Sequence, residues 1–253
     1  MSAHDPLFDL SDRRVVVTGG SRGLGRSMVL GFAERGARVV IASRKLDACE
    51  RLVAEVTDRF GTQALAVACN VSRWDECDRL VDEVLAAWGG IDVLVNNAGM
   101  SPLYPSVDAI TEELFDKVIG VNLKGPFRLM ARVGAHMAAA GGGSIINISS
   151  QGAIRPTADV IPYAAAKAAL NNMTESIASA LGPTVRVNTI MPGRFATDIA
   201  SAWDPEVIEA SNATVALGRV GDPDEIVGAA LYFATQASSF CTGSVLRLDG
   251  GAP

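Results

Sequence analysis

Short runs of β-branched and aliphatic residues alternate with longer segments of helical character, and this alternation constrains the fold more than any other feature. The runs begin near residues 15, 39, 65, 93, 144, 185 and 244. Strands that are separated by helices favour parallel pairing, because each helix returns the chain to the end of the sheet at which the preceding strand began. The sequence therefore predicts an α/β fold, a doubly wound parallel sheet flanked by helices.

The helical segments carry their own start signals. Asp222-Pro223-Asp224-Glu225 supplies an N-cap aspartate, a first-turn proline and a glutamate three residues after the cap. Weaker versions begin at Thr111 and Ser72, and Gly141-Gly142-Gly143 predicts a turn between a helix and the strand at 144. No repeat or long linker interrupts the pattern, so we expect residues 1–253 to form one domain.

Residues 194–217 are irregular in sequence around a short helix signal, DPEVIEAS. Loops this long in compact domains often cover a binding site. We expect a substrate lid here; the alternative is a plain surface excursion.

Composition excludes several classes of protein. A chain of 253 residues with 49% hydrophobic residues can bury a large core, and a net charge of -6 argues against a nucleic-acid surface. Four cysteines without a C-x-x-C pair and two distant histidines predict no metal site. With neither an export signal nor a run of about 18 apolar residues, we expect a cytoplasmic protein that does not enter a membrane.

A glycine-rich stretch, TGGSRGLG, directly follows the first predicted strand and leads into a helix. Gly19, Gly23 and Gly25 lack side chains, so backbone N–H groups can approach a pyrophosphate at the positive end of that helix. A tight turn alone also uses glycine, and this G-x-x-x-G-x-G spacing differs from G-x-G-x-x-G. The next strand must therefore be considered too.

The second predicted strand ends in Ala42-Ser43-Arg44, where an NAD-preferring enzyme places an Asp or Glu on the ribose hydroxyls. Arg44, Ser43 and Arg22 instead suit a 2′-phosphate through charge-assisted hydrogen bonds. The sequence predicts NADP (NADPH) as the preferred cofactor over NAD. The alternative is that both arginines are solvated surface residues.

Tyr163 and Lys167 are four residues apart in the alanine-rich stretch PYAAAKAAL, so they should share one helical face. A free tyrosine titrates near ~10, and a nearby ammonium stabilises the phenolate and lowers that value. We therefore predict that Lys167 lowers the pKa of Tyr163 toward the range useful for acid–base catalysis.

Five motifs in order, TGGSRGLG, NNAG at 96–99, VNLKG at 121–125, Tyr163-A-A-A-Lys167 and PGRFAT at 192–197, span nearly the whole chain. The chain resembles the short-chain dehydrogenase/reductase family, in particular 3-oxoacyl carrier-protein reductases and sugar or ketone dehydrogenases. The resemblance implies a single Rossmann-like domain with a seven-stranded parallel sheet, a homo-oligomer (dimer or tetramer, with homotetramer as our prediction), and an active tetrad of Asn, Ser, Tyr and Lys.

Carried onto this sequence, the resemblance identifies Asn122, Ser150, Tyr163 and Lys167 as the catalytic residues. It implies that Tyr163 transfers the proton, Lys167 also binds the nicotinamide ribose, Ser150 bonds the substrate oxygen, and Asn122 holds a water that links Lys167 to solvent. Ser150 matches the family serine better than its neighbour Ser149, which we interpret as structural. Taken one at a time, such residues more often pack, close turns or bond backbone groups.

The remaining carry-overs concern cofactor binding. NNAG resembles the stretch beside the adenine ribose, Pro192 and Gly193 begin the nicotinamide-side loop, and Thr197 matches the threonine at the carboxamide. Many members carry an aspartate where this chain has Asn70, which makes the adenine contact less certain. The predicted cofactor-binding set is Gly19, Ser21, Arg22, Gly23, Leu24, Gly25, Ser43, Arg44, Asn70, Val71, Asn96, Ala98, Gly99, Tyr163, Lys167, Pro192, Gly193 and Thr197.

These observations predict an NADP-dependent oxidoreductase that transfers hydride between nicotinamide and a small carbonyl or secondary alcohol substrate. One alternative is a 3-oxoacyl carrier-protein reductase, although the helix after Tyr163 has no Lys or Arg beyond Lys167 to meet an acidic carrier. A non-catalytic dinucleotide sensor is the alternative of another class. We expect Arg155 or Arg194 to meet an anionic group, and apolar pocket walls from Leu103, Tyr104, Ile154, Phe195 and Trp203.

Overall fold

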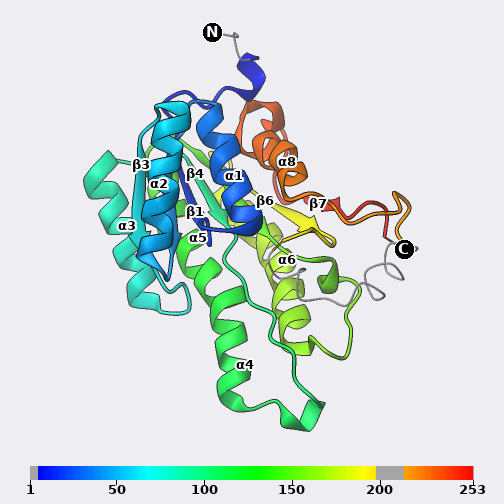
Figure 1. Ribbon diagram of the computed structural model, residues 1–253. Helices are drawn as coiled ribbons and strands as arrows, with labels where there is room; N and C mark the ends of the chain where they lie inside the picture. Colours follow the sequence, from blue (N-terminus) through cyan, green and yellow to red (C-terminus); the bar gives the residue numbers. More distant parts are fainter. Residues whose placement is uncertain (1–4, 198–213, 253) are drawn as a thin grey trace.

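The computed structural model describes residues 5–197 and 214–252, and all seven apolar runs form strands of one parallel sheet (Figure 1). The sheet order is β3-β2-β1-β4-β5-β6-β7. The strands are β1 (Arg14–Thr18), β2 (Arg38–Ser43), β3 (Ala64–Ala68), β4 (Val93–Asn96), β5 (Gly143–Ile148), β6 (Val185–Pro192) and β7 (Val245–Leu248). This confirms the predicted α/β class. The order reverses between β1 and β4, and ligands of such sheets bind at that point, beyond the carboxyl ends of the strands.

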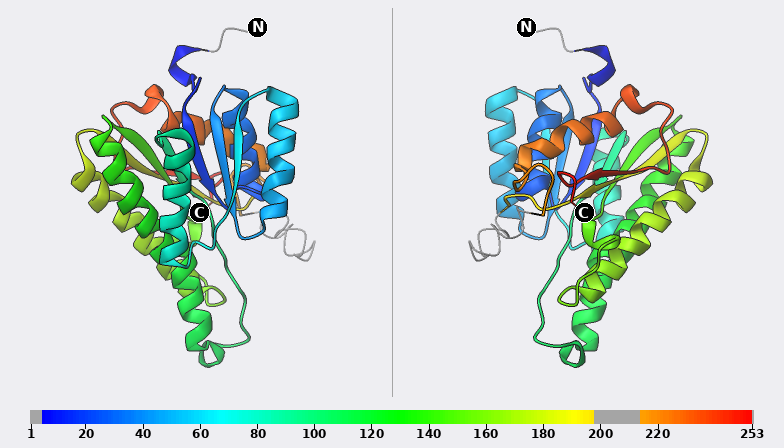
Figure 2. Two further views of the ribbon diagram at one scale, coloured as in Figure 1. Left: turned by 90° about the vertical axis from the view of Figure 1, so that its left-hand side faces the viewer. Right: turned by 90° about the vertical axis from the view of Figure 1, so that its right-hand side faces the viewer.

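Helices cover both faces of the sheet (Figure 2). On one face lie α1 (Gly23–Glu34), α2 (Leu46–Phe60) and α8 (Ile226–Ala234), and on the other α3 (Trp74–Trp88), α5 (Gly125–Ala139) and α6 (Ile161–Leu181). α4 (Glu112–Ile119) continues into α5 through the π-helical turn η3 (Gly120–Lys124). Short 3-10 turns are η1 (Pro6–Phe8), η2 (Val107–Ala109), η4 (Gln151–Ala153), η6 (Pro223–Glu225) and η7 (Gln236–Ser238).

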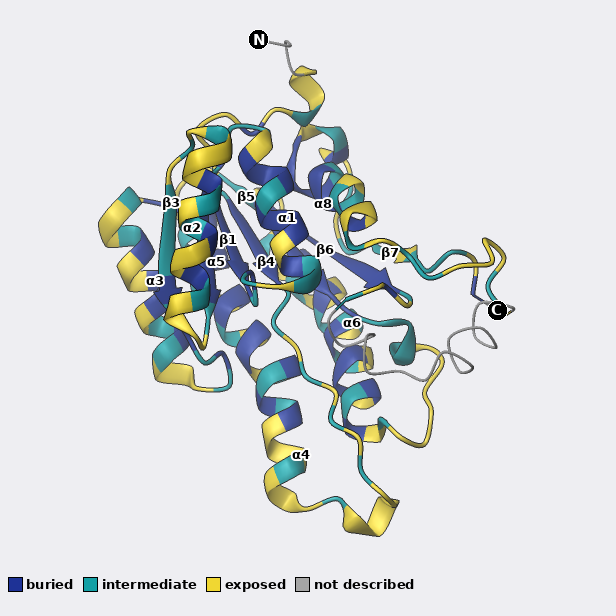
Figure 3. Ribbon diagram, viewed as in Figure 1, coloured by how far each residue is buried: buried dark blue, intermediate teal, exposed yellow. Residues whose placement is uncertain are grey.

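Alternate strand residues feed two separate hydrophobic cores, which explains why the strands read as continuous apolar runs. Val15 and Val17 of β1 pack with α1, α2 and α8, whereas Val16 packs with α3, α5 and α6. β2, β4 and β5 follow the same alternation. The buried strands stand out in Figure 3 against the exposed outer turns of α4. Because helices pack on both faces, the strands are held in place. The candidate site is built at their carboxyl ends.

Two of the predicted helix starts are confirmed. Asp222 forms a capping box with Glu225, and its carboxylate accepts from the amide of Asp224 at 3.0 Å. Thr111 caps α4 by accepting from the amide of Leu114 at 3.1 Å. At both starts, the side chain of the N-cap residue accepts a hydrogen bond from a first-turn amide, so the signal is local in sequence.

The start predicted at Ser72 is wrong. α3 begins at Trp74, its N-cap is Arg73, and no side chain caps it. The hydroxyl of Ser72 donates instead to Oδ1 of Asn70 at 2.9 Å, because these residues form a local turn after β3. The turn predicted at Gly141-Gly142-Gly143 is confirmed, with Gly143 as the first residue of β5.

Residues 198–213, which hold most of the expected lid and Trp203, lie outside the described residues. All four cysteines are free thiols. In the described ranges, no helix combines the length and apolar character needed to cross a membrane, and no group of His, Cys, Asp or Glu side chains suits a metal ion.

Candidate active site

The turn after β1 packs tightly against the end of β4. Gly19 has a φ of 64°, and a Cβ atom there would lie 2.9 Å from the Cα of Ala98. A Cβ at Gly25 would overlap the carbonyl oxygen of Gly19. Both glycines are therefore required by the conformation of this turn as well as by any ligand above it.

Thr18 and Asn97 hold this turn in place by hydrogen bonds, a role that the sequence motifs did not predict. Nδ2 of Asn97 donates to the carbonyls of Thr18 (2.9 Å) and Gly19 (3.1 Å). The hydroxyl of Thr18 donates to the carbonyl of Val95 and accepts from the amides of Asn97 and Ala98. Both residues lie inside quoted motifs, but no spacing pattern separates them from their neighbours.

The N-terminus of α1 has the features of a diphosphate site. Gly23, with φ of 53°, begins the helix, and its N-cap Arg22 makes no side-chain cap bond. Thr197, in the loop after β6, lies with its methyl group 3.5 Å from where a Cβ at Gly23 would sit. Backbone N–H groups at a helix start attract anions, so these residues fit the pyrophosphate of a dinucleotide.

The end of β2 joins the same turn. The hydroxyl of Ser21 bonds that of Ser43 at 3.1 Å, which ties the glycine loop to the strand end that precedes Arg44. Arg22 and Arg44 are exposed, and within the described ranges neither side chain makes a hydrogen bond or ion pair. Two unpaired guanidinium groups and two hydroxyls thus flank one corner of the site, and they fit a phosphate on the ribose.

Tyr163 and Lys167 lie on one face of α6, as predicted. Nζ of Lys167 lies 5.7 Å from the centroid of the Tyr163 ring and donates to the carbonyl of Ile148 at 2.7 Å. The Lys167 side chain is only 3% exposed, and no carboxylate pairs with it in the described part of the chain. A buried amine without a counter-ion is costly, which marks this place as a candidate for function.

Asn122 reaches the same space from η3. Its Nδ2 donates to the carbonyls of Met100 (2.8 Å) and Val118 (2.9 Å), and its Oδ1 accepts from the amide of Met100 at 3.3 Å. The side chain therefore donates to a carbonyl of the helix at the π-helical turn, where the i→i−4 backbone hydrogen bonds are interrupted. A Cβ at Gly99 would lie 3.1 Å from Oδ1 of Asn122 and 3.7 Å from Nζ of Lys167, so both side chains face the backbone of Gly99.

Ser150 lies just beyond β5, near enough to Tyr163 for its hydroxyl to lower the pKa of that phenol. Its Oγ also accepts from the amide of Gly152 at 3.1 Å. Ser149 is buried and donates to the carbonyl of Lys167 at 3.3 Å, which agrees with its structural interpretation. The structure thus brings Asn122, Ser150, Tyr163 and Lys167 together beside the ends of β4 and β5.

Burial controls the ionisation of this cluster. It raises the pKa of Tyr163 above 10, and the hydroxyl of Ser150 opposes that rise only in part. It also lowers the pKa of Lys167 to about 8. The prediction that Lys167 lowers the pKa of Tyr163 is wrong in this structure, because removing the phenolate from water costs more than its surroundings return.

Two residues that were predicted to contact the cofactor, Asn70 and Asn96, use their side chains in hydrogen bonds within the protein. Oδ1 of Asn70 accepts from the amide and the hydroxyl of Ser72, which engages the oxygen expected to meet the adenine amino group. Nδ2 of Asn96 donates to Oδ1 of Asn147 at 2.9 Å inside the sheet. Both side chains therefore hold strand ends in place.

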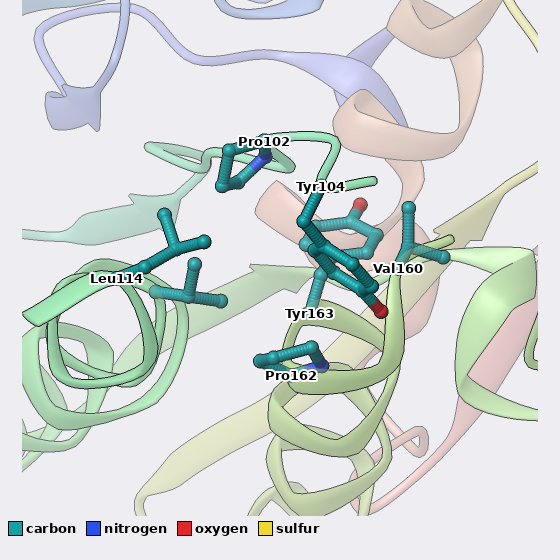
Figure 4. Close-up of a pocket in the computed structure, with 7 residues that line it drawn as sticks. Pro102, Tyr104, Leu114, Val160, Pro162 and Tyr163 are labelled. Carbon is teal, nitrogen blue, oxygen red and sulfur yellow. The ribbon is translucent and has the colours of Figure 1, made fainter. Parts of the chain in front are cut away.

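Of the described residues that were predicted to form the apolar walls of the substrate pocket, only some line a pocket. Tyr104 and Tyr163 line one narrow apolar pocket with Pro102, Leu114, Val118, Val160 and Pro162 (Figure 4). Leu103 and Ile154 are exposed. Phe195 is not a pocket wall: it is 7% exposed and packs in the core against Gly221, because the loop after β6 turns back toward α8.

Comparisons with known proteins agree with this geometry. The sequence model of the family described as "Enoyl-(Acyl carrier protein) reductase" matches residues 19–253. L-rhamnose 1-dehydrogenase (NAD(P)(+)) of Azotobacter vinelandii is 38% identical, over 96% of this chain and 97% of that protein. The chain belongs to the short-chain dehydrogenase/reductase family.

Two further members of the short-chain dehydrogenase/reductase family differ in their cofactor. NAD-dependent glycerol dehydrogenase of Listeria innocua is 33% identical, over 98% of this chain and 96% of that protein. A crystal structure of gluconate 5-dehydrogenase from Burkholderia cenocepacia, in complex with NADP and tartrate, has a TM-score of 0.92 and 33% identity, over 97% of each chain. The family to which this chain belongs thus contains NAD(P)-dependent dehydrogenases with different substrates.

Proposed function

We propose that this chain is an NADP-dependent oxidoreductase that transfers hydride between the nicotinamide and a small carbonyl or secondary alcohol, with Tyr163 as the general acid and base. The observation that carries the proposal is the buried, carboxylate-free Lys167, whose Nζ lies 5.7 Å from the ring of Tyr163. Lys167 can also serve cofactor binding, but a chain that only bound a dinucleotide would not need a phenol beside this buried amine.

The roles of the residues follow from their contacts. The Ser150 hydroxyl is near enough to Tyr163 to lower its pKa, and so lies where it can also orient the substrate oxygen. Tyr163, whose pKa is raised, holds its proton at neutral pH and donates it to that oxygen during reduction. Burial lowers the pKa of Lys167 to about 8, so this amine can release or regain a proton near neutral pH and help to return the proton that Tyr163 gives up. The nicotinamide, when bound, supplies the hydride.

The preference for NADP is supported by Arg22 and Arg44. Neither side chain has a partner in the described part of the chain, whereas most other arginines pair with carboxylates. No Asp or Glu follows β2 at the position that would accept from ribose hydroxyls. A 2′-phosphate would receive charge-assisted bonds there.

A small free substrate is favoured over a carrier protein. α6 has no Lys or Arg after Lys167. Arg128 and Arg132 on α5 pair with Asp78 and Asp82 of α3, each at 2.6 Å. Their charges are largely neutralised, so an acidic carrier would find no basic patch on this face.

Arg155 is the residue we propose for an anionic substituent of the substrate. It lies five residues after Ser150, is exposed, and its side chain has no ion pair within the described ranges. Steady-state constants for matched neutral and acidic ketones decide this point: kcat/KM should favour the acidic one, and equal values would reject the role.

We also propose that the chain forms a homo-oligomer. Phe240 is fully exposed, and Leu246 on the edge strand β7 is 37% exposed. An open apolar sheet edge is a liability in a monomer, and a second copy of the chain would cover it. Light scattering coupled to size-exclusion chromatography measures the mass of the particle in solution. A monomer at the concentration used in activity assays would refute this proposal.

One experiment tests the function as a whole. A panel of ketones, aldehydes and secondary alcohols is screened with NADPH and with NADH by following the nicotinamide absorbance. We expect turnover of at least one small carbonyl compound, faster with NADPH. Tight NADPH binding without turnover of any carbonyl would instead support a cofactor sensor.

A further inference from the structure

The helix that carries Tyr163 begins without a cap of its own. Its N-cap residue, Val160, has no polar side-chain atom, and its φ of -139° and ψ of 30° differ from the extended conformation of ordinary caps. The first-turn amide of Ile161 therefore needs an outside acceptor, while Pro162 has no N–H.

Tyr104 supplies that acceptor from another part of the chain. The amide of Ile161 donates to the phenol oxygen of Tyr104 at 2.7 Å, and the same hydroxyl donates to the carbonyl of Ala158 at 2.8 Å. Tyr104 belongs to the loop between β4 and η2, which also holds Gly99 and Met100. One hydroxyl thus joins the loop after β4 to the first residue of α6.

The ring of Tyr104 also approaches the catalytic phenol. Tyr104 and Tyr163 line the same apolar pocket, together with Val160 and Pro162 (Figure 4). The contact therefore restrains Tyr163 in two ways: through the backbone two residues before it and through the pocket beside its ring.

We propose that Tyr104 is a positioning residue, whose hydroxyl caps α6 from outside and holds Tyr163 in place for proton transfer. The inference rests on the proposed function of Tyr163. It differs from a role in substrate binding, because both hydrogen bonds of the Tyr104 hydroxyl go to backbone atoms. Tyr104→Phe removes these two bonds and keeps the ring in the pocket.

Hydrogen exchange tests the cap without any activity. In Tyr104→Phe, a peptide spanning residues 158–165 should exchange roughly tenfold faster than in the wild type, because a hydrogen-bonded amide loses its acceptor. Peptides from α8 should not change. Unchanged exchange in 158–165 would overturn the capping role.

Kinetics with the full-length enzyme test the positioning. In Tyr104→Phe, kcat should fall about 3- to 10-fold, the range expected for one or two neutral hydrogen bonds, with KM for NADPH unchanged. The primary isotope effect on kcat, measured with NADPH deuterated at the transferred position, should rise because the chemical step is slowed. A variant that is only partly folded would lower kcat without moving the isotope effect.

Tyr232→Phe on α8 is the matched control, because Tyr232 contacts Phe233 and lies outside the site. It should match the wild type in every measurement. If Tyr104→Phe exchanges faster but keeps its kcat and isotope effect, the positioning role is wrong. If the wild type reduces no carbonyl compound, the proposed function fails by itself, and the exchange data still decide whether Tyr104 caps α6.

Discussion

Nζ of Lys167 lies 5.7 Å from the centre of the Tyr163 ring, one turn along the same helix. Burial moves the two groups in opposite directions, raising the pKa of Tyr163 and lowering that of Lys167 to about 8. Both shifts favour the neutral form, because charge is costly away from water. Near neutral pH the phenol thus keeps its proton, and the amine is close to its own pKa.

The buried charge of Lys167 should make stability depend on pH. The unfolded chain keeps this proton up to the ordinary value of 10.5, whereas the folded chain releases it near 8. Folding therefore carries the full cost below pH 8, and the cost disappears as pH rises to 10.5. Lys167→Met should gain stability relative to the wild type at pH 7, and that gain should shrink by roughly 2–3 kcal/mol by pH 10.5.

Urea unfolding of both proteins between pH 7 and 10.5 measures this difference. Lys117→Met, at an exposed position on α4, is the control and should show a constant difference. The hydrogen bond to Ile148 is lost at every pH, so it shifts the whole curve but not its slope. A flat difference for Lys167→Met would show that the amine is not buried as a charge.

Arg22 and Arg44 should set the choice of cofactor. Replacing both by Ala should raise the KM for NADPH about 10- to 100-fold, the range expected for charge-assisted bonds, and leave the KM for NADH nearly unchanged. Arg13→Ala, at the opposite end of β1, should change neither value. Equal losses with both cofactors would mean that the arginines do not read the 2′-phosphate.

Gly19 should tolerate no side chain. Gly61 is the control that distinguishes backbone strain from a steric clash of the added Cβ atom. Both have a positive φ, 64° and 67°, but a Cβ at Gly19 meets the backbone of Ala98 while one at Gly61 meets nothing within 4 Å. Gly61→Ala should cost about 1–2 kcal/mol of unfolding free energy from backbone strain alone. Gly19→Ala should cost more and weaken NADPH binding. Similar losses of stability and normal binding in both would refute the close-approach argument.

Much of the fold was predictable because strands and glycine turns leave local signals. All seven strands follow from short apolar runs, since a parallel sheet buries both faces. The capping box at Asp222 is a purely local pattern and was predicted as such. Ser72 showed the limit of that reasoning, because a Ser before a helix can bond Asn70 just as well.

The site depends on contacts that no local pattern contains. Asn97 locks the glycine turn across two strands, and Tyr104 caps a helix that begins 57 residues later. The raised pKa of Tyr163 depends on how deeply the fold buries the phenol, and sequence spacing gave only its distance from Lys167. Phe195 looked like a pocket wall in sequence, yet the path of the loop after β6 puts it in the core.

Tyr163→Phe tests the central claim most directly, because it removes one oxygen and keeps the ring. Steady-state NADPH oxidation with a carbonyl substrate is measured beside NADPH binding, followed by nicotinamide fluorescence. We expect kcat to fall at least 10²- to 10⁴-fold, the usual contribution of a general acid, with NADPH still bound. Full activity in Tyr163→Phe would contradict the account, because no other described residue was assigned the proton.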